Sequence, residues 1–574
     1  MKIIVFDFEV FKHDTLLGCY LLNEQKYFQS WNKEEMKQFY YKNKNAIWVG
    51  HNNQGYDNFI LEAILNDADP YAVSDAIINQ HAKLRLTIDL NYYDIMQLHK
   101  TSLKTIEAFV GKNISESEVN FNLDRPLTEQ EKLQTESYNR DDLDQTTDNL
   151  KMVKSEFQLR VDLIKEFNLS IDALHYTEAQ IAEAVLKPKA IWNIENLPVH
   201  PVMYPQLKVK NQQMIDYYLN EKFKTNEKLE LEFCGVKHLI GAGGIHGSKD
   251  NSHYDWAYYF DVSGYYNLIM ILYNMLARTI PEEGKKLYEF MYQEQLRLKK
   301  IDPIKRAVYK TILLAVSGAQ RNKHSKFYDP WTGALIPMVG QMFLVDLLEK
   351  LEGKVELIQS NTDGIIAKPL EGVSDEELIA IINEWQQRTG FTLKLDKIYD
   401  IYQRDVNNYM YRDDQGNIHT KGEAVTYYEN YENPLTSNCY NSVEPMILQY
   451  CIVEYFMNGI KPEYTIIKYA HNYKMFQYIC KTLSYDYLSF EAGNKIEKLQ
   501  KVNRCFASKE DGYIYRNKNE KHDRYPSLPD KVFVFNEDLK LLDYKKIDYI
   551  YYVKRAYTKI NKFINIESLK NTAI

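Results

Sequence analysis

The sequence lacks long apolar runs, and its few cysteines lack the close spacing of a metal site. No apolar run reaches the roughly 18 residues that a membrane-spanning helix requires, so we expect no transmembrane helix and no membrane partner. No two cysteines form a Cys-x-x-Cys pair, which argues against a zinc site and against a disulfide framework: Cys19, Cys234, Cys439, Cys451, Cys480 and Cys505. Free thiols in a reducing cytoplasm are expected, and the first residues show no signal-peptide pattern.

The sequence also lacks an overall excess of positive charge. Its net charge of −8 argues at first against a nucleic-acid partner. The distribution argues for one, because residues 285–326 contain 11 Lys or Arg against 3 Asp or Glu, and residues 501–574 contain 16 against 10. A phosphate backbone requires such segregated basic surfaces, whatever the total charge. Ordinary solvated faces carry similar patterns, so charge alone leaves both interpretations open.

Length and hydrophobic pattern predict several domains. A chain of 574 residues is too long for one core and suggests three or four domains. The N-terminal part predicts an α/β domain that ends near residue 155, with strands at 2–10, 17–22 and 46–49 and helices at 57–65, 103–110 and 128–153. Farther along, the patterns predict a linker at 197–205, a strand–turn–helix around Asp261, a basic helical region at 281–316 and a hairpin around Asp363.

The first candidate site is a set of acids near the N-terminus. Asp7 and Glu9 alternate on an apolar strand and therefore share a face. Asp57 opens a predicted helix, and Tyr138 and Asp142 lie four residues apart on another. Clustered acids stay ionised together only with cations, and two Mg²⁺ ions suit these oxygen ligands. Such a metal pair generates a hydroxide and stabilises the leaving oxygen of a phosphodiester, with Tyr138 orienting the attacking water.

These residues resemble the three motifs of the DnaQ-like proofreading exonucleases, in the tyrosine-bearing subclass. The motifs are Asp7-x-Glu9, Asn52-x-x-x-Tyr56-Asp57 and Tyr138-x-x-x-Asp142. The resemblance implies that Asn52 and Tyr56 contact a single strand, with the ring stacking on a base. Ser102 and Leu103 begin a segment that resembles the element gripping the frayed 3′ end in phage polymerases, although a helix core has the same pattern. Solvated surface acids are the alternative for the whole set.

The second candidate site lies in the middle of the chain. A predicted strand ends at Asp261, and cations follow along a predicted helix at spacings that can grip a triphosphate: Arg297, Lys299, Arg306 and Lys310. Residues 261–266 resemble motif A of family B DNA polymerases, which implies that Asp261 binds metal and that the ring of Tyr266 underlies the incoming sugar. Gly264 and Asn267 depart from that motif.

Two further segments resemble motifs B and C of the same family. Lys310 and Gly318 match motif B, whereas Leu314 and Ser317 replace its asparagine and tyrosine, which puts base-pair checking in doubt. Asn361-Thr-Asp363-Gly resembles motif C, which implies that Asp363 is the second metal-binding aspartate. An ordinary hairpin turn is the alternative for Asp363.

Glycine-rich and basic segments flank these motifs at places where relatives bind DNA. Gly243 and Gly244 precede motif A, where the resemblance implies a loop near the template backbone, and a plain flexible loop is the alternative. Lys421 follows motif C and is a candidate primer contact. The Lys- and Tyr-rich C-terminus, including 501–504, fits a thumb that follows duplex phosphates.

The resemblance implies an α/β and α+β multidomain chain, with an RNase H-like exonuclease followed by palm, fingers and thumb. The expected domains are the exonuclease at 1–155, a connecting segment with the start of the palm at 156–235, palm at 236–280, fingers at 281–327, palm at 328–435 and thumb at 436–574.

The implied activity is template-directed DNA synthesis with 3′→5′ proofreading by a phage-type family B polymerase. Each active site would hold two Mg²⁺ ions, with Mn²⁺ as the expected substitute. Expected partners are primer–template DNA, single-stranded 3′ ends and dNTPs, with a helicase or another replisome protein as a further candidate. We expect a monomer in the host-cell cytoplasm. The alternatives are an exonuclease with a degenerate polymerase region and a non-catalytic single-strand binding protein.

The motif spacing predicts how synthesis starts. Asp261 and Lys310 are 49 residues apart and Lys310 and Asp363 are 53 apart, which leaves little room for the insertions that protein-primed phage polymerases carry between these motifs. We predict extension from an ordinary nucleic-acid 3′-hydroxyl, with weak strand displacement on a nicked duplex. Kilobase-scale displacement by the isolated protein would contradict this and would favour a replacement clamp in the C-terminal region.

Overall fold

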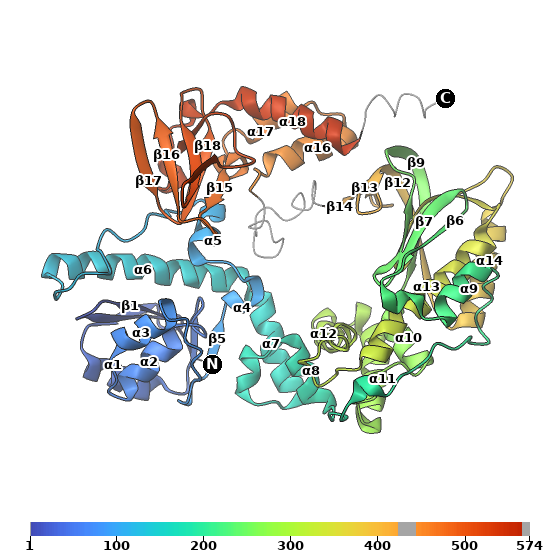
Figure 1. Cartoon of the computed structure of the whole chain (residues 1–574), viewed down its shortest axis with the longest axis horizontal. Coiled ribbons are helices and arrows are strands. Elements are labelled where there is room, and N and C mark those ends of the chain that lie inside the picture. Colours follow the sequence, from blue (N-terminus) through green and yellow to red (C-terminus); the bar gives the residue numbers. More distant parts are fainter. Residues whose placement is uncertain (1, 423–442, 565–574) are drawn as a thin grey trace. The chain divides into compact units, whose positions relative to one another are not determined.

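The computed structural model describes residues 2–422 and 443–564, and the chain divides into two units (Figure 1). Unit 1 comprises Met1–His175, Asn430–Gln449 and Glu463–Ala556, and unit 2 comprises Tyr176–Glu429, Tyr450–Pro462 and Tyr557–Ile574. Both units mix helices with sheets, so the expectation of a mixed α/β multidomain chain is confirmed. The predicted boundaries differ from the units, because unit 1 continues past residue 155 and takes in most of the region expected to form a separate thumb.

The N-terminal part of unit 1 is built on a five-stranded mixed sheet. Its order is β3 (Lys26–Ser30), β2 (Thr15–Leu21), β1 (Ile3–Val10), β4 (Ile47–Gly50) and β5 (Tyr92–Asp94). The first three strands are antiparallel, whereas β1, β4 and β5 are parallel. Helices α1 (Lys33–Asn43), α2 (Asp57–Leu65) and α3 (Pro70–Ile78) cover one face, and α6 (Glu129–Met152) packs against the other.

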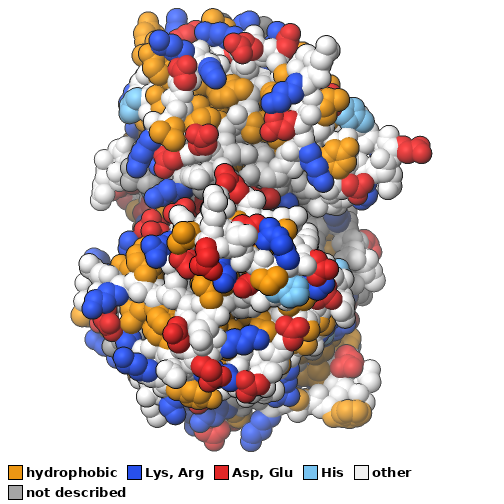
Figure 2. Space-filling view, turned by 90° about the vertical axis from the view of Figure 1, so that its left-hand side faces the viewer, with side chains coloured by type: hydrophobic (Ala, Val, Ile, Leu, Met, Phe, Trp, Pro, Cys, Tyr) orange, Lys and Arg blue, Asp and Glu red, His pale blue; other side chains and the backbone are white. Residues whose placement is uncertain are grey.

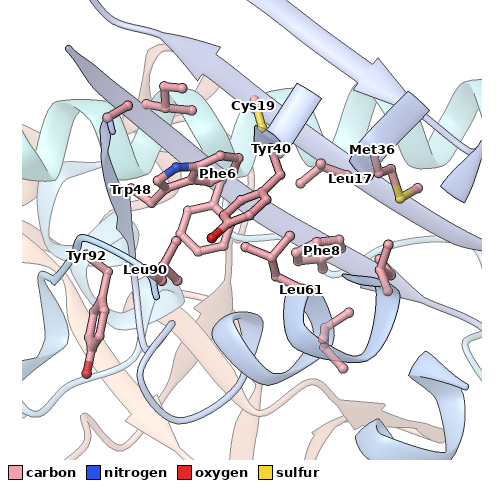
Figure 3. Close-up of a cluster of buried hydrophobic side chains, with 14 of the residues drawn as sticks. Phe6, Phe8, Leu17, Cys19, Met36, Tyr40, Trp48, Leu61, Leu90 and Tyr92 are labelled. Atoms are coloured by element: carbon pink, nitrogen blue, oxygen red, sulfur yellow. The ribbon is translucent and has the colours of Figure 1, made fainter. Parts of the chain in front are cut away.

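The alternation of β1 assigns its residues to these two faces. Its even-numbered apolar residues, including Phe6 and Phe8, join the buried core with Trp48 and with residues of α1 and α2 (Figure 3). Asp7 and Glu9 therefore point to the opposite face, where α6 packs. The predicted strands and helices of this part are confirmed, and the Thr128–Glu131 capping box sets the start of α6. Four short or connecting helices complete it: α4 (Met96–His99), α5 (Leu103–Val110), α7 (Lys154–Phe167) and η1 (Ile171–His175).

The C-terminal part of unit 1 contains two antiparallel sheets. One has the order β15 (Tyr478–Lys481), β18 (Val502–Ala507) and β21 (Val532–Val534), and the other has the order β17 (Lys495–Leu499), β16 (Tyr487–Ala492), β19 (Tyr513–Lys518) and β20 (Lys521–Arg524). The expectation that Arg504 follows duplex phosphates is wrong, because its side chain is fully buried and donates hydrogen bonds to the carbonyls of Ala108, Lys112 and Glu537. On the face shown in Figure 2, basic and acidic side chains are interspersed.

Unit 2 is built on a nine-stranded antiparallel sheet. Its order is β14 (Ile418–Lys421), β13 (Asn408–Arg412), β12 (Leu393–Asp405), β9 (Ser252–Val262), β11 (Gly364–Pro369), β10 (Val355–Asn361), β8 (Gly244–Ser248), β7 (Val236–Gly241) and β6 (Leu229–Phe233). Its helices are α8 (Glu178–Leu186), α9 (Gln212–Leu219), α10 (Tyr265–Leu272), α11 (Glu282–Arg297), α12 (Pro303–Ala319), α13 (Pro330–Leu351) and α14 (Asp375–Thr389). Helices α16 (Ile447–Asn458), α17 (Pro462–Tyr469) and α18 (Tyr549–Phe563) cross the boundaries between units.

The predicted elements around the second site are confirmed with one difference. Strand β9, the turn at Gly264 and α10 form the expected strand–turn–helix, and β10 and β11 form the hairpin. The basic helical region is two helices, because Asp302 caps a new helix whose first residue is Pro303. No helix or strand of the described residues falls in the linker at 197–205.

Helix α13 is the one described helix long and apolar enough to cross a membrane, and 83% of its apolar window is buried inside the structure. The five described cysteines are buried free thiols, as expected, whereas Cys439 lies outside the described residues.

Two candidate acidic sites

The acids of the first site converge from three elements. Ligand oxygens of Asp7 and Glu9 on β1 and of Asp142 on α6 all lie within 4.8 Å of one another. Asp57, the first residue of α2, accepts a hydrogen bond from the backbone amide of Phe8 at 3.1 Å. Because Phe8 lies between Asp7 and Glu9, this bond places Asp57 next to both acids. Tyr138 lies one helical turn before Asp142 and hydrogen-bonds to it. The structure therefore brings together all five residues predicted for this site.

Burial and mutual repulsion dominate the electrostatics of this cluster. Burial, followed by the charges of neighbouring carboxylates, raises the pKa of both Asp7 and Glu9 well above the usual range. Burial also raises the pKa of Asp57 to about 7 and that of Asp142 by a smaller margin. Such a set of carboxylates can hold a metal ion, and a divalent cation would stabilise the ionised forms. The oxygens fit Mg²⁺ but do not by themselves select it.

A lysine that the sequence patterns did not indicate lies against this cluster. The Lys104 ammonium forms ion pairs with Asp142 at 3.1 Å and with Glu107 at 3.2 Å, and it lies 4.9 Å from the centre of the Tyr138 ring. Asn139 donates to Asp7 at 3.0 Å and was missed as well. The Lys104–Glu107 spacing indicates only a helix surface pair, and nothing in the sequence connects it to an acid 38 residues away.

Two predicted single-strand contacts, Asn52 and Tyr56, lie in the segment that precedes α2. Asn52 is exposed and has a left-handed backbone, with φ +68°, and its amide donates to Asp94 at 2.9 Å. Buried Asp94 also accepts hydrogen bonds from the backbone amides of Gln54 and Met96. This residue, which the sequence did not indicate, therefore fixes the loop that precedes α2. Tyr56 is half-buried, and its hydroxyl hydrogen-bonds with Ser74 at 2.8 Å.

The remaining predicted contacts of unit 1 lie at the start of α5. Ser102 is the exposed N-cap residue, and Leu103 is half-buried. The Ser102 and Thr105 hydroxyls are 2.9 Å apart, which ties the N-cap side chain to the first turn of the helix.

The two aspartates of the second site lie close together in the sheet, Asp261 on β9 and Asp363 in the turn that precedes the neighbouring strand β11. Asp261 near the end of β9 pairs with Gly364 of β11, the residue after Asp363, and the Val262 amide donates to the Asp363 carbonyl at 3.0 Å. Burial is the main cause that raises the pKa of each aspartate, and the charge of Asp261 raises that of Asp363 further. Attraction to the positive charge of Lys421 lowers both pKa values, and its contact with a primer stays a prediction.

A cavity of about 380 Å³ opens beside these aspartates. Its lining includes both of them with predicted nucleotide contacts and residues of the altered motif B: Asp261, Asp363, Tyr266, Lys299, Arg306, Lys310, Leu314 and Ser317. The Nε of Arg306 is buried with no hydrogen-bond partner among the described residues, so a donor is available for an anion. Lys394, which pairs with Asp261 across the sheet, also lines the cavity and was missed.

The environment of Arg297 differs from that of the other predicted nucleotide contacts. Arg297 does not line the cavity, and its guanidinium pairs with Glu294 at 2.8 Å, one turn earlier on α11.

The glycine-rich turn lies against the Asp363 turn. Gly243 and Gly244 connect β7 and β8, and the amide of Thr362 donates to the Ile245 carbonyl at 3.2 Å. Gly244 has φ +146°, and a Cβ there would lie 3.0 Å from the Thr362 hydroxyl. The close approach of two turns distant in sequence therefore explains the glycine at 244. Contact of these glycines with DNA stays a prediction.

A comparison of the sequence with models of known protein families gives no match, and neither does a comparison with curated proteins.

The raised pKa values predict a pH-dependent response to metal. A carboxyl whose folded pKa lies above its unfolded value makes the metal-free protein less stable as pH rises through the folded pKa. Metal removes this cost and competes with protons for the ligands. We therefore predict that millimolar Mg²⁺ raises the melting temperature of the protein more at pH 8 than at pH 6. An Asp7→Asn/Glu9→Gln variant should lose most of this difference, and an unchanged difference would contradict the site.

Lys104 should act as a positioning residue for Asp142. Lys104→Met retains the length of the side chain and removes the charge, so we predict a loss of roughly 10–100-fold in metal-dependent degradation of single-stranded 3′ ends, the range typical of groups that orient metal ligands. The matched control is Lys112→Met, since Lys112 is exposed and its nearest acid, Asp148, lies at 3.8 Å. Wild-type degradation by the Lys104 variant would contradict the role.

Proposed function

We propose that the chain is a template-directed DNA polymerase of the phage-type family B, with an intrinsic 3′→5′ proofreading exonuclease. The observation that carries the proposal is the second site, where Asp261 on β9, Asp363 in the turn before β11 and four cations line one cavity. An acidic pair opposite a cationic helix is the arrangement that nucleotidyl transfer needs, since metals align the phosphate while cations bind the rest of the triphosphate.

The topology of each unit agrees with this proposal. The order β3-β2-β1-β4-β5, with β2 antiparallel to β1 and β4 parallel to it, is the arrangement of an RNase H-like fold. The antiparallel sheet that holds Asp261 and Asp363 corresponds to a palm, and helices α11 and α12 correspond to fingers. In this assignment the sheets at 478–534 belong with the exonuclease unit.

The side chains of each site have defined roles in the proposed reactions. In polymerisation, Asp261 and Asp363 would hold two Mg²⁺ ions that align the primer hydroxyl with the α-phosphate. Lys299, Arg306 and Lys310 bind the triphosphate, and the Tyr266 ring lies under the sugar. The neighbouring Tyr265 donates to the Gly340 carbonyl, which leaves Tyr266 as the gate against a 2′-hydroxyl.

In the exonuclease site, the four acids would hold the metal pair that supplies the nucleophile for phosphodiester hydrolysis. Burial raises the pKa of Tyr138 far above neutral, and adjacent acids raise it further, so its hydroxyl stays protonated and can orient the attacking water. The expected partners are primer–template DNA, single-stranded 3′ ends, dNTPs and a helicase or another replisome protein, for a monomer in host cytoplasm.

An exonuclease with a degenerate polymerase region is the second candidate. The residues that favour it are Leu314, which is 52% exposed in the cavity where the family has asparagine, and Ser317, which replaces a tyrosine. Lys310 and both aspartates still line the same cavity, which favours a working site. A purely single-strand binding protein would not need either acidic pair.

We predict that the two activities separate by mutation. Asp261→Asn or Asp363→Asn should reduce primer extension by more than the roughly 100-fold that changes around a metal ligand cost, while 3′-end degradation continues. Asp7→Asn or Asp142→Asn should have the opposite effect. Gel-resolved extension and degradation of labelled primers measure both.

The matched control for the palm is Asp255→Asn, an exposed acid on the same strand β9, which should retain both activities. Full extension by the Asp363 variant would contradict the palm assignment, and loss of both activities from every single substitution would contradict separate sites.

A further inference from the structure

A groove in unit 1 lies beside the first acidic site and has no part in its chemistry. It encloses about 540 Å³ and is bounded on one side by Ser102 and Thr105 of α5. The other side comes from the turn between β15 and β16 and from β17 with the residues after it: Lys481, Thr482, Leu483, Tyr485, Asp486, Tyr487, Lys498, Leu499, Gln500 and Lys501. Segments nearly 400 residues apart in the chain therefore share one surface.

Helix α5 connects this groove to the acidic site. Its N-cap residue Ser102 lines the groove, whereas Lys104, two residues later, reaches Asp142. The C-terminal sheets hold the other end of the helix, because the fully buried Arg504 of β18 donates to Ala108 O at 3.0 Å and to Lys112 O at 2.8 Å. These bonds hold the chain at the point where α5 ends. The groove and the catalytic cluster are thus fixed to the same short helix.

A second set of contacts joins the groove wall to the segment after α5. Glu116 accepts the amide of Lys501 at 3.3 Å, and the Glu116 amide donates to Gln500 at 3.3 Å. Gln500 also donates to the Ile114 carbonyl at 2.6 Å. Each wall both donates and accepts hydrogen bonds with the other. The two walls of the groove are therefore held together by contacts within unit 1.

The side chains on the groove suit unpaired nucleotides. Tyr487 is 38% exposed, and the Lys498 ammonium lies 5.4 Å from the centre of its ring. Leu483 is 76% exposed at the turn and has φ +50°, a strained backbone for leucine. Exposed rings beside lysines bind single strands without sequence preference, since every base has a stacking face and every phosphate a charge. In a duplex the faces of the bases are stacked on one another, so they cannot stack on such a tyrosine.

The charge balance also favours a phosphate backbone. Lys481, Lys498 and Lys501 line the groove, against two acids that each accept a backbone amide. Glu116 is engaged by Lys501 as described, and Asp486 accepts the Asn519 amide at 2.8 Å. The lysines therefore supply the net charge that faces the groove.

We propose that this groove binds the single-stranded segment upstream of the 3′ end, with Tyr487 stacking on a base and Lys498 and Lys501 contacting phosphates. The inference rests on the proposed exonuclease function. It extends the surface that binds the single strand from Ser102 to the C-terminal sheets. It assigns the sheets at 478–534 to single-strand capture during proofreading.

The test is binding of fluorescein-labelled dT12 to the full chain in EDTA, followed by fluorescence anisotropy so that no hydrolysis interferes. Tyr487→Ala should raise Kd at least ~5-fold, the change that corresponds to the lower end of base-stacking energies. Lys498→Ser/Lys501→Ser should reduce the magnitude of the slope of log K against log salt by about 1.4, since each phosphate contact on a single strand contributes about 0.7. Lys495→Ser is the matched control, because Lys495 lies on β17 outside the groove lining and pairs with Glu497 at 3.1 Å.

Hydrolysis measured separately in Mg²⁺ distinguishes the two levels of inference. The groove variants should raise KM for dT12 more than KM for a trinucleotide, because a trinucleotide has fewer upstream nucleotides to place in the groove. Wild-type degradation of dT12 together with unchanged binding by the Tyr487 and lysine variants would overturn the groove and leave the exonuclease standing. Groove-dependent binding with no hydrolysis in any divalent metal would overturn the exonuclease and leave the groove.

Discussion

Repulsion among closely spaced carboxylates is the interaction on which both candidate sites depend. Asp7, Glu9 and Asp142 are held with their oxygens within 4.8 Å, and Lys104 is the protein cation paired with that cluster through Asp142. Burial raises the pKa of each acid, so the arrangement is costly without cations. The apolar face of β1 offsets this cost by packing Phe6 and Phe8 into the core on the other side of the sheet. The proposed metal binding would offset this cost.

Helix α5 links this electrostatic constraint to the rest of unit 1. Its eight residues carry Lys104 on the side of the acids, and its N-cap Ser102 lines the groove. Buried Arg504 donates to the Ala108 carbonyl of this helix, at the cost of desolvating a guanidinium whose pKa burial lowers to about 10. We infer that the C-terminal sheets position this helix. Substitutions in those sheets should therefore change metal binding at the first acidic site.

Local rules predicted the elements and the acids, whereas tertiary contacts decided the rest. Alternation placed Asp7 and Glu9 on one face, charge pairs three and four residues apart predicted α6, and the Asp-Gly signal predicted the hairpin at Asp363. Lys104 and Asp94 escaped notice because their partners lie far away in sequence. Arg297 pairs with Glu294 and does not line the cavity, and composition cannot distinguish the buried Arg504 from a surface charge. Lys104, Arg297 and Arg504 all have long side chains, whose partners sequence spacing does not determine.

The central claim is that one chain both removes and adds nucleotides at two metal-dependent sites. The most direct measurement supplies the purified protein with Mg²⁺, dNTPs and a primer–template whose last primer nucleotide is mismatched, and follows a 5′-labelled primer with time. The proposed function predicts that the primer first shortens past the mismatch and then lengthens to the end of the template, and that EDTA stops both steps. A primer that never lengthens after shortening would contradict the polymerase, and one that lengthens with the mismatch retained would contradict proofreading.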